Sequence, residues 1–366
     1  MPAAAHELAG LTYLAFAAGL SAAAAQVWPA FALVTGLLLV GVVAERDGLF
    51  AAAGAGLARL RTGPRTTFVL ALCLVAVVTA ILNLDTSVFF LTPVLLHLAR
   101  ARRSNELPYL YGAVFMSNAS SLFLPGSNLT NLIVLHQEHV SGAAFLSRLW
   151  AAAIAASVVT TALLVLVFRR ELGEPQRDGE VEHAVPRLGV GAIAVAVSTA
   201  LVLVLSAPAL PVLAAGVAAV ALTRVPWARL QAAGDVRVLG VLFTLAVALG
   251  TLGRSWRGPE RLLDSLDRWQ TAGFGALASI GANNLPAAVL LTPDPPPHPR
   301  ALLLGLNLGP NLAVTGSLSA LLWLRVARSL GAKPSVRRYS QLGLLIVPLS
   351  LGAAVTTLWL VAPGRL

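Results

Sequence analysis

Long apolar segments follow one another along almost the whole chain, and they constrain the fold more than any other feature. The 366 residues are 57% hydrophobic and only 11% charged, whereas a soluble domain carries about 25% charged residues. Many segments approach the roughly 20 residues that an α-helix needs to cross a bilayer. Because lipid offers the backbone no hydrogen-bond partners, such segments must satisfy their own backbone groups. Alternating strand patterns are absent, so the sequence predicts an all-α polytopic membrane protein.

Two of the apolar segments are interrupted by similar polar motifs at corresponding places in the two halves of the chain. Residues 83–93 read NLDTSVFFLTP, and residues 283–293 read NNLPAAVLLTP. A second interruption follows each motif, at 125–128 in the first half and at 314–317 in the second. Paired interruptions of this kind are the best sequence pointer to the binding site of a transporter. We therefore expect a membrane transporter whose site lies at these four breaks.

The order of the segments predicts two membrane repeats, residues 1–168 and 188–366, joined by a polar cytoplasmic linker at 169–187. Each repeat is expected to contain a re-entrant helical hairpin and a broken transmembrane helix. The hairpins then enter from opposite sides, as inverted-topology repeats require. The first repeat is expected to begin with two separate spans, at 8–26 and 28–44, followed by an interfacial helix at 49–62.

The basic residues predict the orientation of the chain. With the N-terminus inside, most of the 26 Lys and Arg residues fall on one side of the membrane. An excess of basic residues marks the cytoplasmic side. This predicts a multi-pass protein of the inner cell membrane with a cytoplasmic N-terminus. It also accounts for the net charge of +10 without a nucleic-acid partner.

The breaks offer a particular set of chemical groups to a solute. A broken helix exposes backbone N–H groups on one side of the break and carbonyl groups on the other, which suit acceptors and cations respectively. Short neutral side chains add further donors and acceptors. The primary candidates for substrate binding are Asn83, Thr86, Ser127, Asn128, Asn131, Asn283, Asn284, Thr315, Gly316 and Ser317. The secondary candidates are Asn118, Asn307 and Asn311. The alternative for individual Asn residues is that they only cap half-helices.

Asp85 is the only acidic residue within the expected membrane region. A buried acid is costly there, so it indicates a function by default. Asp85 is the candidate ion-coupling residue, which would carry a proton or bind a sodium ion. The alternative is a carboxylate that accepts backbone N–H bonds at the hairpin tip and never titrates.

No motif indicates an enzyme, a metal site or a cofactor. The glycines form no Walker pattern, so the chain is not expected to hydrolyse ATP. His136, Glu138 and His139 lack the His-Glu-x-x-His order of zinc proteases. The single Cys73 excludes an intramolecular disulfide and a thiol metal cluster. The expected partners are membrane lipid and a small inorganic or organic ion.

Several motifs resemble the ArsB-type arsenite and antimonite permeases of the ion transporter superfamily, over roughly residues 33–340. The matching stretches are ERDGLF at 45–50, Asp85 with LTP at 91–93, SNLTN at 127–131, NNLP at 283–286, and LGP at 308–310 with GSLSALLWL at 316–324. The resemblance implies a scaffold with two opposed hairpins and two broken helices, often as a homodimer. It also implies proton-driven export of trivalent arsenic or antimony hydroxide, in some relatives with a separate ATPase subunit.

The chain departs from the family pattern at several positions. Leu84 separates Asn83 from Asp85, where the pattern has Asn directly before Asp. Amides stand where acids are expected near Asn118 and Asn307, and a Lys expected near Asn311 is replaced. An uncharged cavity suits neutral As(OH)3, which needs hydrogen bonds rather than a counter-charge. The alternatives are a carboxylate or inorganic anion carrier, a sodium/proton antiporter of the same superfamily, and a non-transporting membrane partner protein.

Overall fold

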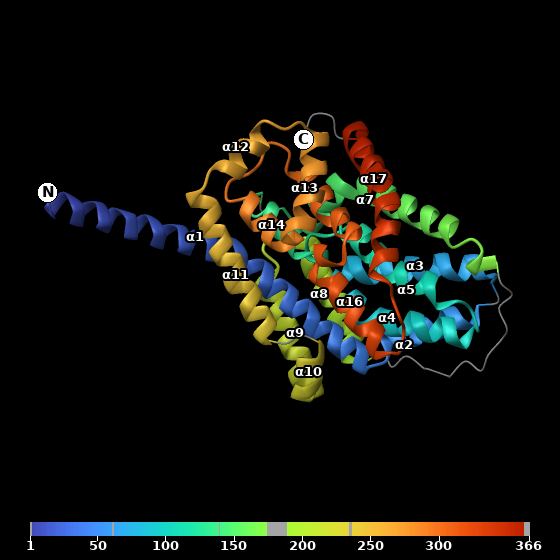
Figure 1. Cartoon of the computed structure of the whole chain (residues 1–366). Coiled ribbons are helices and arrows are strands. Elements are labelled where there is room, and N and C mark those ends of the chain that lie inside the picture. The colour runs from blue at the N-terminus through green and yellow to red at the C-terminus, as the bar shows by residue number, and fades with distance from the viewer. Residues whose placement is uncertain (1, 61, 139, 174–188, 234–235, 362–366) are drawn as a thin grey trace.

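The computed structural model is built of helices throughout the residues that it describes, which are 2–60, 62–138, 140–173, 189–233 and 236–361 (Figure 1). The helices of the first half are α1 (Pro2–Arg46), α2 (Leu49–Arg59), α3 (Pro64–Ile81), α4 (Leu84–Ala101), α5 (Glu106–Ser120), α6 (Leu129–Val134) and α7 (Gly142–Val167). Those of the second half are α8 (Val190–Val204), α9 (Ala209–Thr223), α10 (Trp227–Ala233), α11 (Val236–Ser255), α12 (Gly258–Asp264), α13 (Arg268–Ala282), α14 (Asn284–Leu291), α15 (Pro299–Leu308), α16 (Leu318–Ser329) and α17 (Val336–Val361). Beyond Gly173, the predicted linker lies outside the described residues.

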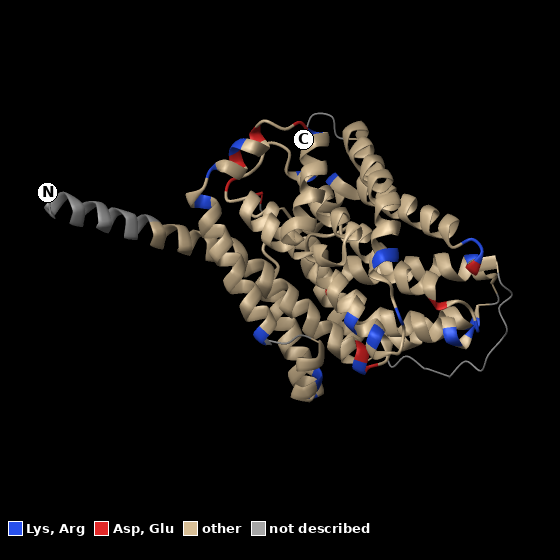
Figure 2. Cartoon of the chain, in the orientation of Figure 1, with Lys and Arg blue, Asp and Glu red and all other residues tan. Residues whose placement is uncertain are grey.

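Within the described residues, six helices are long and apolar enough to cross a membrane. Among the described residues, charged residues lie mainly near helix ends and in connections, and long stretches between them carry none (Figure 2). This distribution fits a chain whose helices are embedded in lipid, because charges are costly in the hydrocarbon region.

The first helix differs from the prediction. α1 is continuous over 45 residues, so the prediction of two separate spans at 8–26 and 28–44 is wrong. Pro29 lies inside this helix rather than at a turn. A membrane helix tolerates proline when neighbouring groups satisfy the carbonyl that it frees. Only Gln26 and Pro29 interrupt the apolar run there, which is too weak a signal to end a helix.

One end of the molecule, which we call the Asp47 end, joins the two halves of the chain. The Gly191 N–H, in the first turn of α8, donates to the Asp47 carboxylate at 2.7 Å. Arg46 donates to the Thr223 carbonyl at the end of α9. Phe50 stacks on Phe90, with ring centroids 5.2 Å apart. The ERDGLF motif therefore connects structural elements and lies apart from the helix breaks.

The opposite end, which we call the Glu138 end, is marked by a group of three charged residues. The Glu138 carboxylate accepts from Arg148 at 2.7 Å and from Arg300 at 3.1 Å. These residues stand just after α6, near the start of α7 and near the start of α15. Three elements are thereby joined at one end of the molecule.

The first hairpin consists of α3 and α4. Ser87 Oγ lies 3.5 Å from the Val75 carbonyl oxygen, so the two helices run back along each other from their break. Arg102, just past α4, donates to the Ala58 carbonyl at 2.8 Å and to the Thr62 carbonyl at 3.4 Å. The open end of this hairpin therefore lies beside α2, which follows Asp47 directly in the chain.

The second hairpin consists of α13 and α14 and opens toward the Glu138 end. Arg268, at the start of α13, lies 5.7 Å from the ring of Trp359 near the end of α17. The connection that follows α14 leads to Arg300, which pairs with Glu138. The two hairpins thus open toward opposite ends of the molecule, an arrangement consistent with the predicted inverted repeats.

Candidate functional site

The first broken helix is formed by α5 and α6, and it is interrupted where the sequence predicts. Helix α5 ends at Ser120, a 3-10 turn follows at Pro125–Ser127, and α6 begins at Leu129. Proline and the extended backbone of Leu124 and Asn128 prevent the helix from continuing.

The second broken helix is formed by α15 and α16. Two short 3-10 turns, Gly309–Leu312 and Val314–Gly316, separate its halves. A Cβ atom on Gly316 would lie 2.7 Å from Pro310 Cα, so only glycine fits this close approach. The predicted break at 314–317 is therefore confirmed.

Asn307 connects the two broken helices from a fully buried position. Its Oδ1 accepts from Asn128 Nδ2 at 2.6 Å and from Ser121 Oγ at 2.7 Å. Its Nδ2 donates to Asn131 Oδ1 at 2.9 Å and to the Leu303 carbonyl at 2.8 Å. Both ends of one amide are thus used, which fixes its orientation.

A second pair of amides also connects the two broken helices, and in this pair each helix donates one hydrogen bond to the other. Asn118, near the end of α5, donates from Nδ2 to Asn311 Oδ1 at 2.8 Å, and Asn311 Nδ2 donates to the Phe115 carbonyl at 3.2 Å. Together the hydrogen bonds of Asn307 and Asn118 form the amide network, whose members are Asn118, Ser121, Asn128, Asn131, Asn307 and Asn311. The three secondary candidates therefore lie at its centre, and two primary candidates join it.

Four primary candidates cap half-helices, as the alternative interpretation proposed. In each case a side-chain oxygen accepts a backbone N–H of the first turn, at distances of 2.7–3.3 Å. The capping residues are Asn83 for α4, Asn128 for α6, Asn283 for α14 and Ser317 for α16. Capping by asparagine occupies the carbonyl oxygen and leaves the amide N–H groups available to other partners.

Each hairpin tip is tied to the break of its own half. Ser127 Oγ donates to the Ala80 carbonyl, just before the first tip, at 3.1 Å. Asn283 Nδ2 donates to the Thr315 carbonyl at 3.1 Å. The four breaks are therefore connected in sequence: first tip, first broken helix, second broken helix, second tip.

Some buried polar atoms at these breaks have no hydrogen-bond partner among the described residues. They are Asn83 Nδ2 and Thr86 Oγ1 at the first tip, Thr79 Oγ1 near the end of α3, and Asn118 Oδ1 in the amide network. Buried polar groups are nearly always paired in native proteins. Unpaired donors and acceptors in this region are therefore groups that a polar solute or water would satisfy.

Two candidates lie outside these connections. Asn284 is buried, and its side chain makes no hydrogen bond within the described part of the chain. Asp85, in the first turn of α4, is partly exposed and likewise has no hydrogen-bond or ion-pair partner there. The acceptor at the first tip is Asn83, so the interpretation of Asp85 as the residue that accepts backbone N–H groups receives no support.

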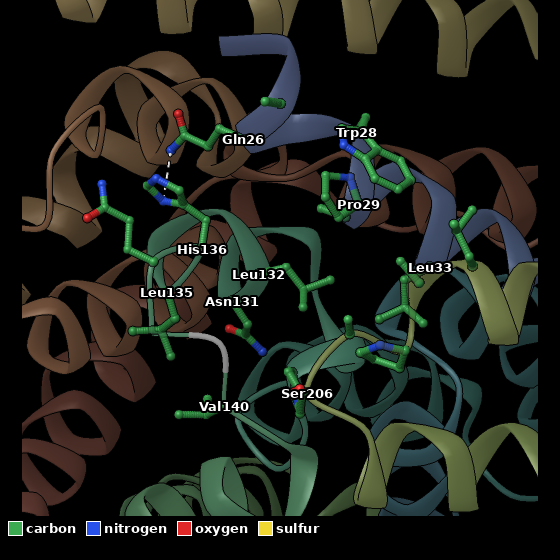
Figure 3. A pocket seen from close by; sticks show the side chains of 18 of the residues that line it. Gln26, Trp28, Pro29, Leu33, Asn131, Leu132, Leu135, His136, Val140 and Ser206 are labelled. Atoms are coloured by element: carbon green, nitrogen blue, oxygen red, sulfur yellow. Dashed lines mark hydrogen bonds between the residues drawn. The ribbon is translucent and has the colours of Figure 1, made fainter. Parts of the chain in front are cut away.

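A cavity of about 1040 Å³ lies beside the amide network, and the sequence did not predict it (Figure 3). Its wall is largely apolar and includes Trp28, Leu33 and Leu132. Asn131 lines it, and so do Gln26 and His136, which lie next to each other (Figure 3).

Gln26 and Arg254, which line this cavity, were missed because each interrupts or ends a long apolar segment as a single polar residue. Arg254 Nη2 donates to Gln26 Oε1 at 2.9 Å, so α11 and α1 are joined at the cavity. The available signal was a single Gln in α1 and a single Arg near the end of α11. Arg254 thereby adds a basic residue to the lining of the cavity.

Two membrane proteins are similar to this chain in sequence, and one solved transporter structure is similar to it in fold. The chain is 25% identical over 372 residues to the 46 kDa membrane protein of Mycobacterium leprae, with 91% of this chain and 86% of the relative covered. It is 26% identical over 337 residues to the arsenical pump membrane protein of Escherichia coli, with 82% and 79% covered. The crystal structure of the Alcanivorax borkumensis YdaH transporter matches with a TM-score of 0.57 at 16% identity, covering 96% of this chain and 89% of that one.

The family assignment rests on a family profile rather than on any single relative. The profile of the citrate transporter family matches residues 4–294, which include both hairpins and the first broken helix. This match agrees with the apolar helices, the paired breaks and the buried amide network described above. The chain is therefore a membrane transporter rather than an enzyme, and it belongs to the citrate transporter family.

Proposed function

We propose that the protein is a secondary transporter that binds its solute at the amide network and exports arsenite or antimonite under a proton gradient. The observation that carries this proposal is the neutrality of the network. Every hydrogen bond described for Asn118, Asn307 and Asn311 joins uncharged groups. Trivalent arsenic hydroxide is neutral at physiological pH and offers hydroxyl groups that both donate and accept.

The unpaired groups at the first hairpin tip support the same solute. Asn83 Nδ2 is a donor and Thr86 Oγ1 is both donor and acceptor, so they match a hydroxyl group of the solute. The carboxyl of Asp85 stands beside them in the chain and is the candidate for carrying the coupling proton. Protonation and deprotonation of this one acid would link solute movement to the gradient.

The second candidate solute is a carboxylate, and a specific feature favours it. The family contains citrate transporters, and Arg254 lines the cavity that reaches Asn131. A guanidinium is suited to bind a carboxylate through paired hydrogen bonds. The described hydrogen bonds of Arg254 go to Gly250, Ala22 and Gln26 rather than to residues of the helix breaks, so the carboxylate is the second candidate.

We propose inverted repeats at 1–168 and 188–366, with 169–187 as a cytoplasmic linker, and an inner-membrane location. A homodimer and a separate ATPase subunit are proposed partners from the resemblance to arsenite permeases. The relative from Escherichia coli is named as part of an arsenical pump.

The test is solute uptake into everted membrane vesicles, with arsenite and citrate compared in parallel. Arsenite accumulation that requires a proton gradient and disappears in Asn307→Ala would support the proposal. Accumulation of citrate but not arsenite would replace arsenite by the carboxylate. Accumulation of neither would contradict both solutes. A matched control is Thr244→Ala, because Thr244 is exposed on α11 and bonds only within its own helix.

A further inference from the structure

We propose that Gln26 is a positioning residue that holds the second hairpin and the first broken helix against α1, in the conformation whose cavity opens at the Glu138 end. The inference rests on the proposed transport function, because it concerns how the two parts separate during transport. Gln26 lies outside the amide network, and the network by itself does not indicate from which end of the molecule a solute enters.

Gln26 is 5% exposed and uses both ends of its amide. Its Nε2 donates to the Thr292 carbonyl at 2.7 Å and lies 3.3 Å from His136 Nδ1 and 3.5 Å from the Ile133 carbonyl. Its Oε1 accepts from Arg254 Nη2 at 2.9 Å. The contact with His136 is visible among the side chains that line the cavity (Figure 3).

These partners belong to different parts of the molecule. Thr292 directly follows α14, so it is the last residue of the second hairpin. Ile133 and His136 belong to the end of the first broken helix. Arg254 lies on α11, which packs along α1: Arg254 Nη2 is also 3.4 Å from the Ala22 carbonyl. One side chain thus joins both solute-binding elements to the α1–α11 pair.

The cavity shows which conformation these bonds accompany. Its lining includes Ser206 and Pro208 from the α8–α9 connection, and Gln137, just before Glu138. Ser206 and Gln137 are exposed, and Gln137 adjoins Glu138 in the chain, whereas Asn131 of the amide network is buried in the same wall. The amide network is thus approached from the Glu138 end while the Gln26 bonds are formed.

In alternating access, one group of helices moves against another around the solute site. Closing the cavity requires the second hairpin and the first broken helix to move relative to α1. The bonds of Gln26 to Thr292 and Ile133 must then break. Gln26 therefore stabilises the state that is open at the Glu138 end, and its removal shifts the population toward the other state.

The experiment measures the accessibility of the cavity and needs no solute. Leu132→Cys is made in a Cys73→Ser background, so that the cavity carries the only thiol. A membrane-impermeant trimethylammonium methanethiosulfonate is added to vesicles of each orientation. We expect labelling from the face that bears the Glu138 end. Gln26→Met keeps the side-chain volume and removes the hydrogen bonds, and it should lower this labelling rate by about fivefold. That factor follows from a tenfold shift between two equally populated states, the effect of roughly 1.4 kcal/mol.

Gln137→Met is the matched control, because Gln137 lines the same cavity on an exposed position. Gln26→Glu keeps an acceptor for Arg254 but loses the donor to Thr292, so its rate should fall in the same direction even if Gln26→Met fails to fold. Equal labelling rates in the Gln26 and Gln137 variants, or no labelling of Leu132→Cys from the Glu138 face, would overturn the proposal. Because the readout is labelling, a failure of arsenite uptake would leave this result standing.

Discussion

Asn307 is the residue on which most of the buried polar contacts between the two broken helices depend. Its replacement by Ala leaves Asn128, Asn131 and Ser121 with buried groups that have lost their shared partner. Each such group costs roughly 1–3 kcal/mol. We expect Asn307→Ala to lower the thermal unfolding temperature by several degrees and to abolish uptake.

A second variant separates the two halves of this amide. Asn307→Asp keeps the oxygen that accepts from Asn128 and Ser121 but removes the donor to Asn131 and Leu303. Because a carboxylate at this buried position would face two acceptor oxygens, the unfolding temperature of Asn307→Asp should fall at least as far as that of Asn307→Ala in a thermal-shift assay of the purified protein. Equal stability of wild type and Asn307→Ala would contradict a structural role for the network.

Asp85 is tested through its charge. Asp85→Asn keeps the shape of the side chain and removes the ionisable group, which has no partner among the described residues. If Asp85 carries the coupling proton, uptake driven by a proton gradient should disappear. Exchange of labelled solute at equal concentrations on both sides should persist. Gradient-driven uptake that survives the change would exclude Asp85 from coupling.

The candidate residues could be named from the sequence, but their contacts could not. Asn83, Asn128 and Asn283 stand at local interruptions of apolar runs, and interruption is a signal that single-sequence reading detects. The pairing of Asn118 with Asn311 depends on how two broken helices cross, and no local pattern encodes this. Gln26 and Arg254 are lone polar residues whose meaning appears only once α1 and α11 lie side by side.

At the scale of the elements, the shape of the second broken helix depends on one glycine. A side chain on Gly316 would meet the backbone of Pro310, so Gly316→Ala must displace the two 3-10 turns. The displacement would move Ser317, which caps α16. We expect uptake to fall by at least about tenfold, since small misplacements at a binding site are costly in rate.

The control for this variant is Gly281→Ala near the second hairpin tip, where an added Cβ meets nothing within 4 Å. Uptake by vesicles containing equal amounts of each protein is the measurement. A Gly316→Ala protein with full uptake would contradict the need for a tight turn at this break.

Element boundaries were predicted well where the chain carries a strong local signal. Both hairpins and both breaks contain Asn, Pro or Gly at the interruption. Proline lacks a backbone N–H to continue a helix, and asparagine caps the start of the next one. The start of the chain lacks such a signal, and there the prediction of two spans was wrong. Helix α1 continues through Pro29 because its apolar run and its packing along α9 and α11 favour one long helix.

At the scale of the whole molecule, the continuous α1 changes the expected orientation. If α1 crosses the membrane once, its first residues and Arg46 lie on opposite sides. The excess of basic residues still favours the Asp47 end as cytoplasmic. We therefore propose that the start of α1 lies on the outer side of the membrane. This differs from the cytoplasmic N-terminus that two separate spans predicted.

Two exposed serines test this orientation. Ser329 is the last residue of α16, and Ser265 lies in the connection before the second hairpin. In a Cys73→Ser background, Ser329→Cys should react with an impermeant thiol reagent only from the cytoplasmic face. Ser265→Cys should react only from the outer face. Labelling of both from one face would contradict the opposed hairpins.

The contact between Asp47 and α8 also bears on the order in which the chain assembles. The carboxylate belongs to the first half of the chain, yet its partner Gly191 is synthesised 144 positions later. Until the second half emerges from the ribosome, the acid just after α1 lacks this backbone donor. We therefore expect the face of α1 that packs against α8, α9 and α11 to stay uncovered by protein until the second half of the chain has been synthesised.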